Sequence, residues 1–475
     1  MKGKYSYLSK NILLFALSGV VPKLLAFFLI PIYTGYLSTA EYGTADLINT
    51  TVELLLPICT LTIHDAVLRF GMNKDYSAKE VLSNGLFVAF LGTIIVVIGC
   101  FLVSYFKLLE ISNTYLFFLI LLFFINGMNN IVTRFCRTID KVQVITIGGI
   151  ANSIATFSLN ILFLVVFKWG INGYLATMCI GHGASLLICF FGARLYRYLT
   201  LKLSKKTLKK MIAFSFPMIF SALAWWINNA SDKYILNWFC GVSVSGIFAI
   251  SNKIPSLLAA IQTIFLSAWS ISAIKDFDKN DSDGFIGNIY TVFQLLMLVA
   301  SSGLMIVNYP LAEFLYAKEF FVAWQYVPPL LMANYFNAMS LYMDGLFMAV
   351  NDTKLISIST LFGAIINTIC NFILIYFFGA YGAAIATMIG FGAGFLFRLV
   401  AFKKYVKIKV NRKREIFCVL LIGIQMGSSF LKWASLFIQI PIVFFILFLY
   451  RKELKNLLIS IKSRSGNSRD KEENQ

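Results

Sequence analysis

Trp225–Pro255, WWINNASDKYILNWFCGVSVSGIFAISNKIP, sets the architecture of this chain. The stretch is apolar enough to cross a lipid bilayer, yet polar and charged residues interrupt it. Among them are Asn228, Asn229, Asp232, Lys233 and Lys253. A charged side chain at bilayer depth costs at least about 2.5 kcal/mol, so it normally faces a bundle interior or a water-filled cavity on a substrate or ion path. The stretch therefore predicts transmembrane helices around a polar, partly cationic chamber.

The composition of the whole chain points the same way. It has 475 residues, of which 59% are hydrophobic and 13% charged, and a mean hydropathy of +0.78. Soluble globular proteins carry roughly 25% charged residues. The chain is therefore predicted to be an all-α polytopic membrane protein. Its net charge of +19 does not predict a nucleic-acid partner, because nearly all the basic residues lie in short gaps between apolar runs, where they suit membrane topology and lipid headgroups.

The eight cysteines fall singly in or beside apolar runs, without a CxxC pair and without histidine at ligand spacing. We interpret them as small core residues, and we predict no metal site and no cofactor. The first apolar run, Ile12–Tyr33, is too long for the apolar region of a signal peptide and is expected to be a retained helix.

Splitting the sequence at polar and turn-forming clusters gives about 14 transmembrane helices, since one span needs roughly 20 mostly apolar residues. The predicted helices are 11–34, 43–68, 81–106, 114–133, 142–167, 171–195, 211–238, 243–273, 285–308, 323–350, 354–378, 381–402, 415–432 and 434–450.

The basic residues between these helices indicate the topology. The segments on one side hold only four of them, Lys107, Lys168, Lys318 and Lys432. The other loop lysines and arginines, Arg398 among them, fall on the opposite side. Because loops rich in lysine and arginine stay in the cytoplasm, this asymmetry predicts that both termini are cytoplasmic.

The chain also contains an internal repeat. YLSTAEYG at 36–43 is echoed by FCGVSVSG at 239–246, and the segment 160–178 by 371–388, both of which end in Ala-Thr-Met. Two six-helix repeats are therefore expected to form two lobes, parallel because six is even, with the site between them. The predicted units are an N-lobe at 1–205, a C-lobe at 206–410, two C-terminal helices at 411–453 and a cytoplasmic tail at 454–475.

Polar residues form stripes on several predicted helices. On helix 211–238, Trp225, Asn228, Asn229 and Asp232 are three or four residues apart, so they share a face, with Lys233 near its edge. Other polar residues that interrupt apolar helices are Asp46, Asn49, Thr50 and Glu53 on helix 43–68, Asp344 on helix 323–350, Lys23 after Pro22, and Lys253 before Pro255.

Two interpretations of these stripes remain open. In the structural one, asparagine and threonine side chains bond across helices, and Asp232 or Asp46 pairs with a lysine. In the functional one, Lys23, Lys233 and Lys253 contact substrate, because ionisable residues within a membrane mark functional sites by default.

His64 and Asp65 close helix 43–68 near the cytoplasm, and Arg69 follows them. We interpret them as a gate or a helix-end contact, with proton coupling by the histidine as the alternative. Trp225, beside the asparagine pair, is a candidate for stacking on a sugar. The loops hold no Ser-His-Asp set, Gly-rich phosphate loop or paired acid and base, so no catalytic residue and no enzyme activity are predicted.

Seven short motifs carry a family resemblance. They are KN at 10–11, PIYT at 31–34, YLSTAEYG at 36–43, DAVLRF at 65–70, SDKYIL at 231–236, GIFAISNKIP at 246–255 and YGAAIAT at 381–387. In this order they resemble polysaccharide-type, O-antigen-flippase-like proteins, the oligosaccharide-lipid branch of the multidrug/oligosaccharidyl-lipid/polysaccharide exporter superfamily. The match spans both halves of the chain.

The resemblance implies a V-shaped pair of six-helix lobes with two further C-terminal helices. It also implies a flippase that moves undecaprenyl-diphosphate-linked oligosaccharide from the cytoplasmic to the outer leaflet of the bacterial cytoplasmic (inner) membrane by alternating access. Lys23, Lys233 and Lys253 would contact the diphosphate, as functional analogues of the cavity cations in the related lipid II flippases. This cavity has lysines and no arginine, so the bidentate grip of arginine on phosphate is absent.

The implied partners are the polyprenyl-diphosphate-linked glycan, membrane lipids, and a glycan polymerase with other assembly proteins. Because no ATP site is visible, an ion gradient or the membrane potential is the available energy source. Asp46, Glu53, Asp232 and Asp344 are the candidates for ion coupling. Two rivals stay open: a drug or cation antiporter of the same superfamily, which should favour an acidic cavity, and a membrane enzyme of glycan assembly, which should carry a long external loop.

Overall fold

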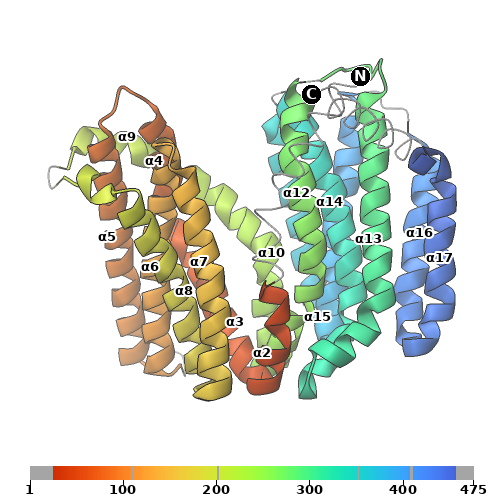
Figure 1. Cartoon of the computed structure of the whole chain (residues 1–475), viewed down its shortest axis with the longest axis horizontal. Coiled ribbons are helices and arrows are strands. Elements are labelled where there is room, and N and C mark those ends of the chain that lie inside the picture. The colour runs from red at the N-terminus through yellow and green to blue at the C-terminus, as the bar shows by residue number, and fades with distance from the viewer. Residues whose placement is uncertain are drawn as a thin grey trace, which may run out of the picture.

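The computed structural model describes residues 25–108, 111–200, 203–275, 277–350, 352–406 and 410–455, and all regular secondary structure within them is helical. Lys23 therefore lies outside the described residues. Figure 1 shows α5 to α8 gathered on one side and α12 to α17 on the other, with α2 and α10 between them. The two groups meet where α3 packs against α10 and α11.

Helices of the first half of the chain surround two hydrophobic clusters of their own. Their bounds are α2 Ile30–Tyr36, α3 Thr39–Cys59, α4 Ile63–Met72, α5 Ala78–Tyr105, α6 Asn113–Thr138, α7 Val142–Asn160, η1 Ile161–Val166, α8 Gly170–Gly192, η2 Leu195–Tyr198 and α9 Lys205–Ser215. Much of the surface of α5 is exposed and apolar, as expected for a lipid-facing helix.

The second half contains the largest hydrophobic core. Its helices are α10 Met218–Cys240, α11 Val242–Ser251, α12 Lys253–Lys275, α13 Phe285–Leu315, η3 Lys318–Gln325, α14 Val327–Ala349, α15 Thr353–Phe402, α16 Arg412–Ser428, η4 Ser429–Ser435 and α17 Leu436–Leu449. Tyr33 and Tyr42 from the first half belong to this core, and the Thr34 hydroxyl donates to the Leu315 carbonyl at 2.8 Å. The two halves are therefore joined by packed side chains and hydrogen bonds.

Two predicted helices are broken in the structure. Between α3 and α4 the axis bends by 55°, where Leu61 and Thr62 adopt left-handed φ values of 53° and 48°. Between α9 and α10 the axis bends by 40° at Pro217, which has no N–H to continue the helical hydrogen bonds. The prediction of one continuous helix over 43–68 was therefore wrong, and His64 and Asp65 begin α4 instead of closing a helix.

Other predicted boundaries agree with the structure. Gly379, with φ 55° and ψ −135°, interrupts α15 where the predicted helices 354–378 and 381–402 meet, and Lys432 interrupts η4 in the same way between α16 and α17. By length and composition, eight stretches within the described residues can cross a membrane, or up to ten if each bent pair is one span. Two of the eight contain these interruptions and can each hold two spans, which gives up to twelve within the described residues, and the total of fourteen stays a prediction. The chain is a multi-pass membrane protein.

The two halves approach each other closely where α3 and α11 cross at Gly43 and Gly246. A Cβ atom on Gly43 would lie 2.2 Å from the Val242 carbonyl oxygen, and one on Gly246 would lie 2.1 Å from the Thr39 carbonyl oxygen. Real Cβ atoms essentially never come this close to another atom. Glycine at both positions is therefore required for the two backbones to touch.

Candidate functional site

Lys233 on α10 and Asp46 on α3 form an ion pair between the two halves of the chain. The Lys233 Nζ lies 2.8 Å from the Asp46 Oδ2, and each side chain keeps about one-fifth of its surface exposed. The Lys233 ammonium also donates to the Thr50 hydroxyl at 3.4 Å. One of the pairings that the sequence left open, Asp46 with a lysine, is therefore present.

Local sequence places these groups on facing sides of α3 and α10. Ser38 and Glu41 form a capping box that fixes where α3 begins. Asp46, Thr50 and Glu53 then follow four and three residues apart, so they lie on one face. Facing them, the indole N–H of Trp226 donates to the Thr50 carbonyl at 3.1 Å, and the Tyr234 and Thr51 hydroxyls lie 2.5 Å apart.

Three carboxylates surround Lys233, and all lie close enough to act electrostatically on its ammonium. Asp46 pairs with it directly. One Asp232 oxygen accepts the backbone N–H of Lys233 at 2.8 Å, and Glu53, which is exposed, accepts the Asn49 side-chain amide at 2.9 Å. The cluster therefore carries more negative than positive charge.

Trp225, Asn228 and Asn229 of α10 are each at least partly exposed. Trp225 is 60% exposed, in contrast to its buried neighbour Trp226. Asn229 is exposed and uses its side-chain amide to bond the Trp225 carbonyl at 2.7 Å, and Asn228 is half-buried. Trp225 and the two asparagines thus form an aromatic and amide surface on α10.

Lys253 begins α12 and lies in different surroundings. Its side chain is half-buried, and within the part of the chain that the structure describes no carboxylate lies at ion-pair distance from it. Its charge acts on Tyr174 of α8, which packs with Tyr33 and Tyr42 at ring-centroid distances of 5.0 and 5.8 Å. Because the Asp46 charge also acts on Tyr174, this tyrosine cluster is close to both sites.

Asp344 on α14 is held in a separate buried ion pair. The Arg398 Nε lies 2.9 Å from the Asp344 Oδ1, and the Arg398 guanidinium also donates to the Thr360 hydroxyl at 2.9 Å. The sequence assigned Arg398 to a cytoplasmic loop, which was wrong, because it lies inside α15 and is 7% exposed. Its place in the apolar run FLFRLVAF at 395–402 was the available signal.

His64, Asp65 and Arg69 lie on α4 and contact other elements of the first half. Asp65 lies 3.5 Å from Arg134 of α6 and 3.6 Å from the His64 imidazole. The Arg69 guanidinium lies over the Phe214 ring of α9, 4.8 Å from its centroid. None of these contacts involves Lys233, Asp46 or Lys253, so the structure does not join the predicted gate to the α3–α10 cluster.

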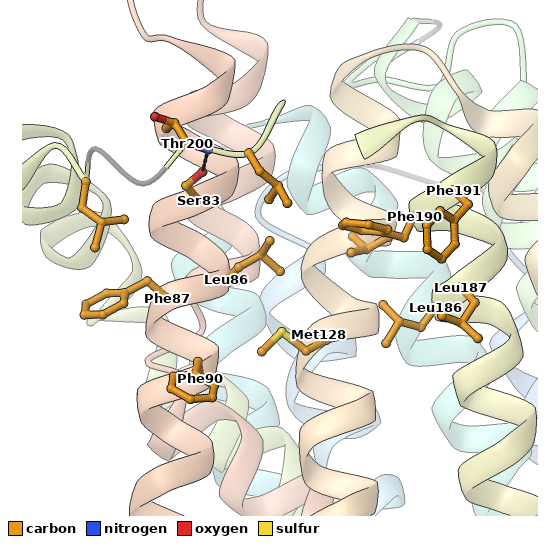
Figure 2. Close-up of a pocket in the computed structure, with 13 residues that line it drawn as sticks. Ser83, Leu86, Phe87, Phe90, Met128, Leu186, Leu187, Phe190, Phe191 and Thr200 are labelled. Carbon is orange, nitrogen blue, oxygen red and sulfur yellow. Dashed lines mark hydrogen bonds between the residues drawn. The ribbon is translucent and has the colours of Figure 1, made fainter. Parts of the chain in front are cut away.

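No group of three or more His, Cys, Asp or Glu side chains that would hold a metal ion occurs among the described residues. A cavity of about 690 Å³ opens between α5, α6 and α8, and Figure 2 shows that Phe87, Leu186 and Phe190 line it. At one end of the cavity the Thr200 N–H donates to the Ser83 hydroxyl at 2.9 Å, as Figure 2 shows. This apolar cavity shares no residue with the polar cluster.

Comparison with known proteins places these features in context. The model of the family described as "Polysaccharide biosynthesis protein" matches residues 8–274. The Shigella dysenteriae protein named "Putative O-antigen transporter" is 24% identical over 398 residues, 80% of this chain and 96% of that protein. The Haloferax volcanii protein named "Probable low-salt glycan biosynthesis flippase Agl15" is 23% identical over 261 residues, and the match spans only 54% of its length.

Solved structures of transporters share the fold. The structure titled "Lipid II flippase MurJ, inward closed conformation" aligns with a TM-score of 0.70 at 15% identity, covering 93% of this chain and 100% of that one. An inward-facing multidrug resistance MATE family transporter of the MOP superfamily aligns with a TM-score of 0.58 at 13% identity, covering 85% of this chain and 94% of that one. The predicted all-α membrane fold is confirmed.

Proposed function

This chain belongs to the polysaccharide biosynthesis protein family, and from that premise we propose that it is a flippase for lipid-linked glycans. It moves undecaprenyl-diphosphate-linked oligosaccharide from the cytoplasmic to the outer leaflet by alternating access of two lobes, residues 1–205 and 206–410. It lies in a bacterial cytoplasmic (inner) membrane with both termini in the cytoplasm. Two relatives are named as an O-antigen transporter and a glycan flippase, which supports a transporter over an enzyme.

The observation that carries this proposal is the half-buried cation of Lys253 without a carboxylate partner among the described residues. An uncompensated ammonium within a membrane protein is costly, so it persists where a ligand supplies the opposite charge. A diphosphate is such a ligand, and Lys233 and Lys23 would add to its binding. The polyprenyl tail would remain in lipid.

Contacts for the glycan would come from α10. Trp225 offers an exposed ring face for a sugar, and Asn228 and Asn229 offer amide groups for its hydroxyls. The Asp46–Lys233 pair spans the two halves at this place, so its opening would accompany substrate entry. Asp46, Glu53 and Asp232 are the coupling groups for an ion gradient, and Asp344 is the less favoured one because Arg398 already neutralises it.

A cation or drug antiporter is the second candidate function, and one observation favours it. Three carboxylates surround the single Lys233, and Glu53 is exposed. An acidic site of this kind would suit a cationic solute. The two functions place opposite requirements on Lys253. A flippase requires its positive charge, whereas the same charge would impair a cation antiporter.

The test is the leaflet distribution of labelled undecaprenyl-diphosphate glycan in cells depleted of the protein. The flippase proposal expects the glycan to accumulate on the cytoplasmic leaflet and to return to the outer leaflet when the protein is restored. Unchanged distribution in a strain without other flippases would exclude the proposal. Loss of tolerance to cationic drugs in the same strain, with normal glycan distribution, would favour the antiporter.

A further inference from the structure

A second charged site lies between α16 and α17, away from the helices of the proposed transport path. A cavity of about 620 Å³ opens between the first turn of α16 and the C-terminal turn of α17, at the end of the molecule that is predicted to face the cytoplasm. Its basic lining residues are Lys413, Arg414, Arg451 and Lys452. Glu453 is the one acidic residue that lines it.

The charges in this cavity do not balance. Glu453 is already paired with Arg414, whose Nη1 lies 2.6 Å from the Glu453 Oε1. Arg414 is further held over the Tyr450 ring, 4.0 Å from its centroid. Lys413, Arg451 and Lys452 are exposed, and no carboxylate among the described residues lies at ion-pair distance from them. Three positive charges therefore face the cavity without neutralising partners.

Below this cationic rim the wall is aromatic. Phe417 lies one turn along α16 from Lys413, and Phe448 lies one turn before Arg451 and Lys452, and both rings are exposed. Phe445 packs against both, with ring centroids 6.0 Å from Phe417 and 6.5 Å from Phe448. The Arg451 guanidinium lies over Phe448 at 4.3 Å from its centroid. The cavity is thus cationic at its mouth and apolar along the helices.

We propose that this cavity binds an anionic phospholipid, with the headgroup phosphate on Lys413, Arg451 and Lys452 and an acyl chain along Phe417, Phe445 and Phe448. Basic pockets between transmembrane helices on the cytoplasmic side bind anionic headgroups, and the negative inner leaflet attracts such residues. Arginine offers two donors to a phosphate and lysine a point charge. The site needs no transport activity, so it is independent of the proposed function.

The bound lipid would steady the last two helices against the second half. Buried polar contacts already fasten α16 and α17 to α13, among them the Tyr450 hydroxyl on the Gln294 side-chain carbonyl at 2.7 Å and the Ser302 hydroxyl on Gln425 at 2.7 Å. A ligand that bridges Lys413 on α16 and Arg451 on α17 adds a further link at their open end. Binding to the folded state raises thermal stability.

The test uses purified full-length protein in nanodiscs of phosphatidylcholine with or without 20% phosphatidylglycerol, a fraction we choose on the order of that of anionic lipid in a cytoplasmic leaflet. We expect phosphatidylglycerol to raise the melting temperature, and native mass spectrometry to show one retained phosphatidylglycerol. The triple variant Lys413→Ala, Arg451→Ala, Lys452→Ala should lose both effects. A matched variant that removes three exposed lysines of α9, Lys205→Ala, Lys206→Ala and Lys209→Ala, should keep them.

Three outcomes would overturn the proposal. Equal retention of phosphatidylglycerol by the triple variant would place the lipid elsewhere, and equal loss by the α9 variant would show attraction by bulk charge alone. A third arm adds inorganic phosphate, or undecaprenyl diphosphate, to protein in phosphatidylcholine. If either stabilises the wild type as well as phosphatidylglycerol does, and does so through the three rim residues, the cavity is a site for a soluble anion or for the transport substrate.

Discussion

Lys233 and Lys253 are both lysines within apolar helices, yet their surroundings differ. Asp46 holds the Lys233 ammonium at 2.8 Å, with two more carboxylates nearby, so an incoming phosphate must compete with them. Lys253 has no such competitor among the described residues. Under the proposed function, Lys253 would make the first contact with the charge of the substrate, and Lys233 would in addition hold α10 against α3.

Lys253→Ala should weaken substrate binding by about 1.5–3 kcal/mol, roughly ten- to a hundredfold in affinity, because one charge-assisted contact is lost. Lys253→Arg keeps the charge and should retain most export. The measurement is outer-leaflet glycan at matched protein level in the membrane, with Lys74→Ala in the exposed α4–α5 loop as control. Full export by Lys253→Ala would remove this residue from the substrate path.

The Asp46–Lys233 pair can be examined by a double-mutant cycle. Removing one partner of a fully buried pair costs about 3–5 kcal/mol, and the cost here should be smaller because both side chains are partly exposed and because Asp232 and Glu53 remain near the Lys233 ammonium. Asp46→Leu alone should therefore lower the melting temperature, and Asp46→Leu with Lys233→Met should recover part of the loss. If the double variant regains stability and also exports glycan normally, the pair is only a structural link between α3 and α10.

At the scale of the helices, the Asp344–Arg398 ion pair links α14 to α15. Both side chains are largely buried, and Thr360 satisfies a further N–H of the guanidinium. Such a pair couples the position of one helix to that of its neighbour. It would serve ion coupling only if it opened during transport.

Replacing Arg398 tests which of these roles Asp344 has. Arg398→Met should destabilise the protein by about 3–5 kcal/mol, since it leaves the Asp344 carboxylate buried and unpaired. Adding Asp344→Leu should restore thermal stability, measured by fluorescence-detected size exclusion after heating. Normal glycan export by the stable double variant is the expected result, whereas a stable variant without export would return Asp344 to the coupling pathway.

The sequence predicted the elements better than their breaks. Apolar run length located the helices and Gly379 marked the interruption of α15, because glycine reaches positive φ without strain. The break at Leu61 and Thr62 itself holds no glycine and no proline, and Pro57 one turn earlier did not mark its position in the sequence. Likewise, the residue spacing grouped the polar side chains of α10, but it could not predict which of Asp232 and Asp46 would pair with Lys233, since that depends on how α3 and α10 pack.

Considered as one molecule, the chain has its two halves in contact at α2, α3, α10 and α11. The Lys318 ammonium donates to the Gly35 carbonyl at 2.7 Å and Thr39 donates to Glu319 at 3.1 Å, next to the Gly43–Gly246 crossing. The Lys233–Asp46 pair joins α3 to α10. Any alternating movement of two lobes would have to separate or rotate this set of contacts.

Gly43→Ala should prevent the close contact, because its new methyl group would lie 2.2 Å from the Val242 carbonyl oxygen. Overpacking of this kind typically costs about 1–3 kcal/mol, and α3 must move away from α11. We expect a lower melting temperature and reduced export. Gly99→Ala on α5, which meets nothing within 4 Å, is the matched control and should leave both unchanged. Identical behaviour of the two variants would refute the backbone contact.

The Gly43–Gly246 crossing resembles the interface of a symmetric homodimer, although both sides of it belong to one chain. The repeat aligns these two glycines with each other, and the contact is reciprocal: Gly43 faces Val242, and Gly246 faces Thr39, the repeat partner of Val242. In a symmetric dimer one mutation would alter both sides at once. Here a mutation alters only one half, yet neither glycine can be replaced without a clash against the backbone of the other half. The two glycines thus constrain each other across the two halves, and the second loss should cost less than the first because the helices have already parted.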